Sequence, residues 1–338
     1  MRRIEPMVQE VAIAPFVEKL TSSATVDIYE LFHFLLFDIV GQLSFSKDFG
    51  LVRTGNHPIV NYLKEAQKYG ILEYQFPAIR LVGSRFGKES YDGIIRFCQD
   101  LIDQRRKDEP KKDILQDFLD AKDEAGQPIP DADIGAEMVT QVIAGTDTTA
   151  NTLTWTLKLL LENPIEMDKV VAELDAAFPS PDDISAESVK EKCAYLDAVI
   201  NESMRLFPIA AGYLARVVPE GGANFDGYHL PAGTECGVAT FAYHRSPQIW
   251  EDSSKFNPSR FLGPNAAAAK TQFIPFLAGP RSCTGREMAW MAMYLSLANL
   301  LRRFKVTWHD PSLTVTHCYF LVLKPVESKM LIDVSART

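Results

Sequence analysis

The chain has 338 residues, of which 46% are hydrophobic and 23% are charged, so it can bury a large core as one big domain or two ordinary ones. Its formal net charge of -9 argues against general nucleic-acid binding, because a polyanion would be repelled. The five cysteines are widely spaced, odd in number and without a Cys-x-x-Cys pair. This excludes a disulfide framework and a structural zinc site, and it indicates a reducing compartment.

The first 130 residues are expected to be mostly helical. Apolar residues cover most of the surface of a helix predicted at 26–45, which should therefore be buried. Further helices are predicted at 57–70 and 89–106. The charge run at 105–113, "RRKDEPKKD", is expected to lie in solvent.

Two stretches bear on targeting. Residues 1–10 are charged and lack the apolar segment of a signal peptide. The longest uncharged apolar stretch, 288–301, is too short to span a bilayer and is expected to be a core helix. We therefore expect no transmembrane segment and a chain that is soluble or at most peripheral to a membrane.

The rest of the chain is predicted to be helical first and partly β later. A long helix is expected at 134–161, where a proline at 164 ends it. Shorter helices are expected at 165–178, 184–191 and 195–208. Residues 215–244 and 313–334 are predicted to form short strands and turns. The pattern indicates a mainly α chain with a minor β portion, and composition marks no domain boundary, so we expect a single domain over 1–338.

The segment "FLAGPRSCTGREMAW" at 276–290 places Cys283 just before an apolar helical pattern. A helix N-terminus has free amides and a positive dipole end, which favour an anion and hence the metal-binding thiolate. Gly279 permits a turn with positive φ, and Gly285 leaves room for a flat ligand. Arg281 offers a cation suited to a carboxylate.

Three interpretations of Cys283 follow from the residues alone. It could be a buried structural cysteine. It could be a nucleophile, but the nearest histidines, His244 and His309, stand in no recognisable triad setting. It could also be an axial thiolate to heme iron, with Arg281 pairing a heme propionate.

The heme interpretation accounts for five positions at once in the pattern F-x-x-G-x-R-x-C-x-G: Phe276, Gly279, Arg281, Cys283 and Gly285. This pattern resembles the heme-binding loop of the cytochrome P-450 family of heme-thiolate monooxygenases. The resemblance implies that Cys283 ligates the iron and that the other four residues hold the cofactor.

The run "AGTDTT" at 144–149 lies inside the predicted long helix. Glycine and threonine are poor helix formers, and the Thr148 hydroxyl can bond the Ala144 carbonyl four residues back and open a local bend. Taken alone, the run is more simply a helix whose threonines bond their own backbone. It also matches the oxygen-activation motif of the family. That match implies an oxygen groove made by Ala144, Gly145, Asp147 and Thr148, in which Asp147 and Thr148 deliver protons.

Glu202 and Arg205 stand three residues apart on one helix face among apolar neighbours. A buried pair must be fully hydrogen-bonded, and Arg260 in "FNPSRF" can supply a third partner. The three residues resemble a structural triad of the family that holds the heme loop, although Ser259 stands where the family commonly has glutamate. Arg216, in "LARVV", resembles an arginine that pairs a heme propionate.

The resemblance covers essentially the whole chain and is closest in type to fungal members of secondary metabolism or aromatic hydroxylation. It implies a cytochrome P-450-like fold lacking its N-terminal part, because the helix at 26–45 resembles a middle helix of the family and no Trp-x-x-x-Arg occurs before residue 130. We therefore expect exposed apolar surface where a missing sheet would pack.

The resemblance also implies a function. One oxygen atom from dioxygen would enter a small apolar organic substrate. No Gly-x-Gly-x-x-Gly follows a predicted strand, so electrons are expected from an NADPH-dependent reductase that docks on a basic face near Arg286. The expected location is the cytoplasm or the cytoplasmic face of the endoplasmic reticulum.

Other functions stay open at this point. One is a heme-binding but inactive truncated fragment. Another is a reductase-independent heme-thiolate isomerase or dehydratase, against which the Asp147–Thr148 pair argues because such enzymes have less need of proton delivery. A helical interaction protein without heme is the remaining class.

Overall fold

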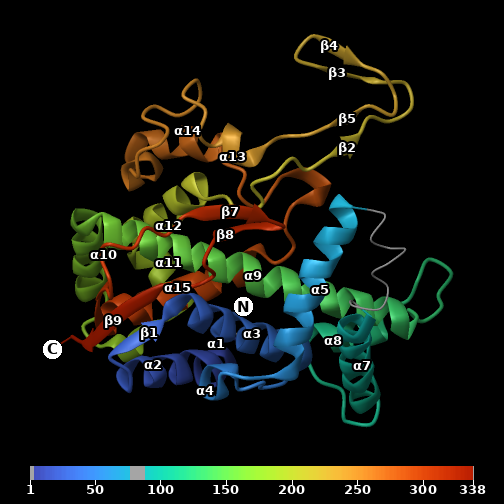
Figure 1. The fold of residues 1–338 in the computed structure, drawn as a ribbon, viewed down its shortest axis with the longest axis horizontal. Coiled ribbons are helices and arrows are strands. Elements are labelled where there is room, and N and C mark those ends of the chain that lie inside the picture. The colour runs from blue at the N-terminus through green and yellow to red at the C-terminus, as the bar shows by residue number, and fades with distance from the viewer. Residues whose placement is uncertain (1–3, 77–87, 338) are drawn as a thin grey trace.

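The computed structural model describes residues 4–76 and 88–337 (Figure 1). The longer helices are α2 (Ala14–Thr21), α3 (Ile28–Phe45), α5 (Pro58–Gln75), α7 (Lys88–Arg105), α8 (Ile114–Asp120), α9 (Asp131–Glu162), α10 (Pro164–Ala177), α11 (Ala186–Lys192), α12 (Ala194–Leu206), α14 (Ala266–Thr271) and α15 (Arg286–Arg303). Short helices are α1 (Glu5–Val8), α4 (Leu51–Thr54) and α13 (Thr240–Tyr243), with a π-helical turn η1 (Gln9–Ile13) and 3-10 turns η2 (Pro181–Asp183), η3 (Pro258–Phe261), η4 (Gly263–Asn265) and η5 (Gly279–Arg281). The mainly α prediction is confirmed.

The strands form one small sheet and three two-stranded ribbons. The sheet joins β1 (Thr25–Asp27), β9 (Leu331–Ala336) and β6 (Phe304–Trp308), all antiparallel, in that spatial order. The ribbons pair β2 (Arg216–Val217) with β5 (Glu235–Cys236), β3 (Ala223–Phe225) with β4 (Tyr228–Leu230), and β7 (His317–Phe320) with β8 (Val322–Pro325). The sheet ties an N-terminal strand to the C-terminal segment, on the same side of the helical body (Figure 1).

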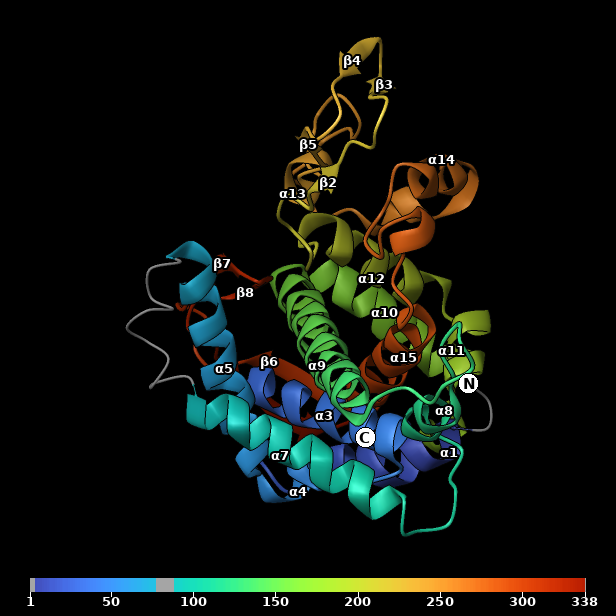
Figure 2. The same ribbon diagram turned by 90° about the vertical axis from the view of Figure 1, so that its right-hand side faces the viewer.

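One hydrophobic core is shared by α3, α9, α12 and α15. The long helix α9 runs through the middle of the body, and α3 packs along it (Figure 2). In the described residues, α3 is the one helix long and apolar enough to cross a membrane by length and composition, and 78% of it is buried inside the protein. Such burial is that of a core helix, and the prediction of a buried helix at 26–45 is confirmed.

The β2–β5 and β3–β4 ribbons extend away from the helical body as an arm (Figures 1 and 2). Large apolar side chains on this arm are exposed, among them Val217 at 65% and Tyr228 at 75%. These exposures do not test the expectation of an apolar surface left by a missing sheet, which stays a prediction.

Helices predicted from periodicity are present, with ends shifted by a few residues: the one expected at 57–70 continues to Gln75. Two predictions in the last third need correction. Strand β6 at Phe304–Trp308 was not expected, although its alternating burial is visible in the alternation of large apolar with polar residues. Residues 240–243, expected as strand or turn, form the helix α13, which is too short to show a helical period.

The charge run at 105–113 is not wholly solvated. Arg105 and Asp113, at its two ends, form a buried bidentate ion pair with both N–O distances 2.6 Å, and their side chains are 4% and 1% exposed. Arg105 also donates to the Phe45 carbonyl, and Ser46 donates to Asp113. These contacts fasten the end of α7 and the start of α8 to the end of α3, so only the middle of the run lies in solvent.

Candidate heme-binding site

Cys283 lies in a tight loop at the entrance to α15. Its amide donates to the Phe276 carbonyl at 2.8 Å, which closes the loop over the 3-10 turn η5. Gly279 has φ +67°, the positive value expected from the sequence. The Cys283 thiol is exposed, and α15 begins three residues later with Gly285 as its N-cap. The loop thus presents a thiol to open space beside the positive end of an 18-residue helix.

The cysteine loop and the middle of α9 meet at one side chain, Met288. A Cβ added to Gly145 would lie 3.1 Å from the Met288 Cε atom, and one added to Gly285 would lie 3.9 Å from the same atom. Ala144, next to Gly145, is exposed although α9 is buried along the half that follows. Two segments far apart in the sequence, the middle of α9 and the start of α15, therefore lie close together at Met288.

Gly145 has a packing role that sequence reasoning did not find. A Cβ there would lie 2.8 Å from Cγ2 of Val40 in α3, closer than real side chains approach. Glycine therefore lets α9 lie close against α3 and Met288. At Gly285, by contrast, a Cβ would make only ordinary contacts, so its role toward a flat ligand stays a prediction.

The threonine-rich run bonds its own backbone. The Thr148 hydroxyl donates to the Ala144 carbonyl at 2.6 Å, as the spacing predicts, and Thr152 donates to the Thr148 carbonyl at 2.9 Å. The secondary structure remains α-helical from 131 to 162, so the local bend stays a prediction. Asp147 lines a cavity between α3, α5, α9 and β8, and Thr148 is not among the residues that line it.

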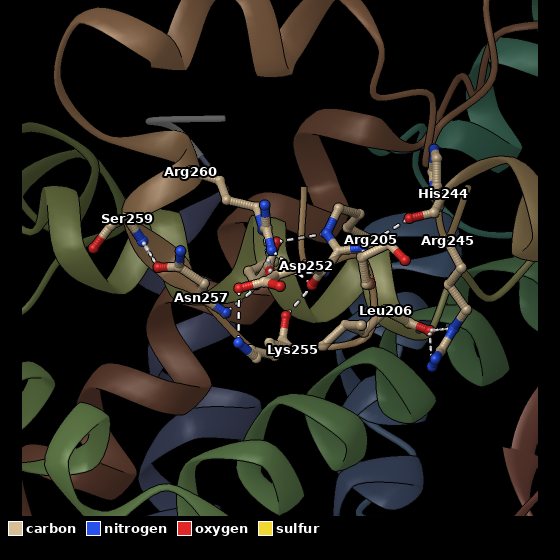
Figure 3. Close-up of polar contacts among 11 residues, drawn as sticks. Arg205, Leu206, His244, Arg245, Asp252, Lys255, Asn257, Ser259 and Arg260 are labelled. Carbon is tan, nitrogen blue, oxygen red and sulfur yellow. Dashed lines mark hydrogen bonds and ion pairs between the residues drawn. The ribbon is translucent and has the colours of Figure 1, made fainter. Parts of the chain in front are cut away.

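The structure brings Glu202, Arg205 and Arg260 together. Figure 3 shows the two arginines of this cluster side by side. Arg205 and Glu202 are 0% exposed and joined by two bonds of 2.8 Å, and Arg260 Nε reaches Glu202 at 3.2 Å. The remaining N–H groups of Arg205 donate to the backbone carbonyls of His244, Ser253 and Lys255. A buried guanidinium with all its donors satisfied organises the surrounding chain. Ser259 is exposed, which explains why its departure from the family pattern leaves the cluster intact.

His244 connects this cluster to the cysteine loop, and sequence reasoning considered it only as a base. Its carbonyl accepts from Arg205 at 2.7 Å, while its ring Nε2 accepts from the Ile274 amide at 3.1 Å, just ahead of Phe276. Burial, and after it the charge of Arg205, lowers the pKa of this ring to about 4. Because Nε2 accepts a hydrogen bond, the neutral ring is the form that holds the loop.

The pKa of His244 predicts a pH dependence of stability. The unfolded ring binds a proton below its ordinary pKa of 6.5, whereas the folded ring resists protonation down to about 4. The free energy of unfolding should therefore be highest above pH 6.5 and fall by about 3 kcal/mol as the pH drops to 4. Urea unfolding of the wild-type chain and of His244→Gln across this range measures the contribution. The free energy of unfolding should depend less steeply on pH in the variant than in the wild-type chain. Equal pH dependence in both proteins would refute the lowered pKa of His244.

Both predicted propionate arginines are exposed. Among residues 4–76 and 88–337, neither Arg281 nor Arg216 has a carboxylate partner, and Arg216 donates only to the carbonyls of Leu214 and Ala215.

Phe276 packs beside Trp290, with ring centroids 6.3 Å apart, and the guanidinium of Arg286 lies over the Phe276 ring. Around Arg286 a cavity of about 520 Å³ carries both bases and acids, including Lys190, Lys270, Glu187 and Glu287, so this face is of mixed charge rather than basic.

These residues fit a heme bound through one thiolate. Within the described part of the chain, no group of three or more His, Cys, Asp or Glu side chains could hold a metal ion. A lone exposed thiol at a helix entrance therefore suits a metal whose other ligands come from a macrocycle. The two exposed arginines on separate segments are suited to the carboxylates of such a group.

Comparison with known proteins agrees with this fit. The cytochrome P450 family model matches residues 1–331. Cytochrome P450 monooxygenase mpsF of Macrophomina phaseolina is 33% identical over 318 residues, covering 90% of this chain and 77% of that protein. Cytochrome P450 monooxygenase LUC2 of Fusarium sp is 34% identical over 294 residues, covering 85% of this chain and 57% of that protein. Cytochrome P450 monooxygenase helB3 of Aspergillus fumigatus is 32% identical and is likewise covered over 57% of its length.

Among solved structures, the cytochrome P450DA heme domain superposes with a TM-score of 0.88 at 23% identity, over 99% of this chain and 73% of that one. This likeness shows the fold. The family model spans nearly the whole chain, and the cofactor of the family is heme held by a cysteine thiolate. The chain belongs to the cytochrome P450 family.

Proposed function

We propose that this chain is a heme-thiolate monooxygenase that inserts one oxygen atom from dioxygen into a small apolar organic substrate, in secondary metabolism. The observation that carries the proposal is the exposed Cys283 thiol, whose loop meets the middle of α9 at Met288. Relatives that cover most of this chain bear the name cytochrome P450 monooxygenase. This chain spans just over half the length of two of them.

Heme, when bound, supplies the activation of dioxygen. The residues of the chain have separate tasks around it. Cys283 would be the axial ligand, and Arg281 and Arg216 would hold the propionates. Asp147 would pass protons from the cavity that it lines. Thr148, the next residue of α9, carries the hydroxyl that would act with it.

The reaction consumes two electrons and two protons for each oxygen atom inserted. The electrons must come from outside, and we propose an NADPH-dependent reductase in the cytoplasm or at the cytoplasmic face of the endoplasmic reticulum. The mixed charge around Arg286 supports a docking surface with paired charges rather than a uniformly basic one.

The substrate is proposed to be apolar because of the residues near 209–214. The backbone of Ile209 is held by a hydrogen bond from the Leu323 amide at 3.0 Å. Gly212 lies against the ring of Tyr319, since a Cβ on this glycine would be 2.4 Å from the Tyr319 hydroxyl. These contacts hold the 209–214 segment against the β7–β8 ribbon, and the apolar character of the segment supports an apolar substrate.

Asp147→Asn tests the proposal. With reductase and NADPH supplied, product formed per NADPH consumed should fall about 100-fold, because proton delivery contributes at least that much. Hydrogen peroxide should account for the electrons that no longer reach the substrate. Asp310→Asn, at a partly exposed carboxylate after β6 that bonds only the nearby Ser312, is the matched control and should leave the ratio unchanged.

The same assay separates the alternatives. A heme-binding but inactive chain would show the heme spectrum and no turnover in the wild-type protein. An isomerase or dehydratase would form product without NADPH or reductase. Either result would overturn the monooxygenase proposal.

A further inference from the structure

The cavity lined by Asp147 has a volume of about 310 Å³ and lies between α3, α5, α9 and β8. Its lining includes polar and charged side chains from all four elements and the flanking segments, among them Asp27, Glu30, Lys64, Lys68, Lys324 and Ser328. A cavity with such walls can hold water. It therefore offers a polar route to a carboxylate on α9.

His33, on α3, also lines this cavity and faces Asp147. Its Nε2 atom lies 3.9 Å from Asp147 Oδ1, and the two side chains are 19% and 25% exposed. Its Nδ1 atom lies 2.7 Å from the Tyr29 carbonyl oxygen. A carbonyl can only accept, so Nδ1 carries the hydrogen and the neutral ring turns the lone pair of Nε2 toward Asp147. The Tyr29 ring, with its centroid 4.3 Å from that of His33, holds the imidazole in place.

The charges around His33 keep it neutral at rest yet able to accept a proton. Burial lowers the pKa of His33 below its ordinary value, and Lys64 and Lys324 lower it further, while Asp147 and the bond to Tyr29 oppose them. Burial also raises the pKa of Tyr29 to about 12, so this phenol stays neutral. The 3.9 Å gap is too long for a direct hydrogen bond, but a single water bonded to both atoms can bridge it.

We propose that His33 is a positioning residue that passes protons from cavity water to Asp147. Nε2 takes a proton from cavity water, which solvent replaces, and gives it to Oδ1 of Asp147 through one bridging water; the ring then returns to its neutral form with Nδ1–H unchanged. Protons come from solvent, and no electron moves. The inference rests on the proposed role of Asp147 in the monooxygenase.

The first test needs no turnover. In the reduced, carbon-monoxide-bound holoprotein with labelled histidine, NMR should show His33 with its hydrogen on Nδ1. Asp147→Asn should lower the pKa of His33 further, because the carboxylate that raises it is gone. A hydrogen on Nε2, or an unchanged pKa in the variant, would refute the contact on which the proposal stands.

The second test uses His33→Phe, which keeps a ring against Tyr29 but removes both nitrogens. Product per NADPH should fall about 10-fold, with a larger solvent isotope effect and an unchanged carbon-monoxide spectrum. His309→Gln is the matched control, because His309 also pairs with an aspartate, Asp333 at 2.9 Å, but on the exposed sheet. The same product per NADPH and the same solvent isotope effect in His33→Phe and in the control would overturn the proposal. If the wild-type chain shows no turnover, the proposed function fails, but the NMR titration still tests the contact between His33 and Asp147.

Discussion

Glu202→Ala is expected to lower the free energy of unfolding by about 3–5 kcal/mol. The substitution leaves the guanidinium of Arg205 buried at 0% exposure without its carboxylate, and an unpaired buried charge is among the most costly defects in a folded protein. It also removes the acceptor for the Asn257 amide and for Arg260. Urea unfolding followed by circular dichroism at pH 7 measures the loss.

The matched control is Glu65→Ala. Glu65 pairs with Lys68 at the same three-residue spacing, at 2.7 Å, but both side chains are about 60% exposed. An exposed pair contributes under about 1 kcal/mol. The conservative variant Glu202→Gln keeps the shape and loses the charge, so its loss should fall between the two. Losses in Glu202→Ala and Glu65→Ala that agree within error would show that the cluster does not organise the fold.

Destabilisation of this cluster should also reach the heme site. Arg205 binds the carbonyl of His244, and the His244 ring binds the amide of Ile274 at the start of the cysteine loop. The cluster thus sets the position of the segment that carries Cys283 through two consecutive hydrogen bonds. These two hydrogen bonds explain how the triad can hold the heme loop, the structural role that the sequence predicts for it.

Local patterns in the sequence predicted most of the helices and the form of the cysteine loop. The burial of α3 follows from apolar residues on most of its surface, and the positive φ of Gly279 follows from the tight turn before Cys283. The Thr148 hydroxyl bonds the carbonyl four residues back because a helix places the two groups together. Each of these features depends on residues within a few positions of one another.

Contacts between distant segments could not be predicted in this way. Nothing near His33 in the sequence indicates Asp147, and nothing near His244 indicates Ile274. Arg105 and Asp113 were expected in solvent because their neighbours are charged, whereas the end of α3 covers both. The sequence assigned Gly145 to an oxygen groove. Only the structure shows that the missing side chain of Gly145 also lets Val40 of α3 pack against α9. Burial of these groups is decided by tertiary packing.

Cys283→Ala is expected to abolish thiolate ligation completely. Cys283 is the one exposed cysteine among the five, and Cys98 and Cys193 are buried with pKa values that burial raises to about 11 and about 12. Those two thiols therefore cannot replace it as thiolates at neutral pH. Cys236→Ala, at a partly buried cysteine on β5, is the control and should leave ligation intact.

The reduced, carbon-monoxide-bound absorption spectrum tests the central assignment most directly. The wild-type chain and Cys236→Ala should both show the Soret band characteristic of thiolate-ligated heme, and Cys283→Ala should lack it. A thiolate band that persists in Cys283→Ala, or a wild-type chain that binds no heme, would contradict the assignment of Cys283 as the iron ligand.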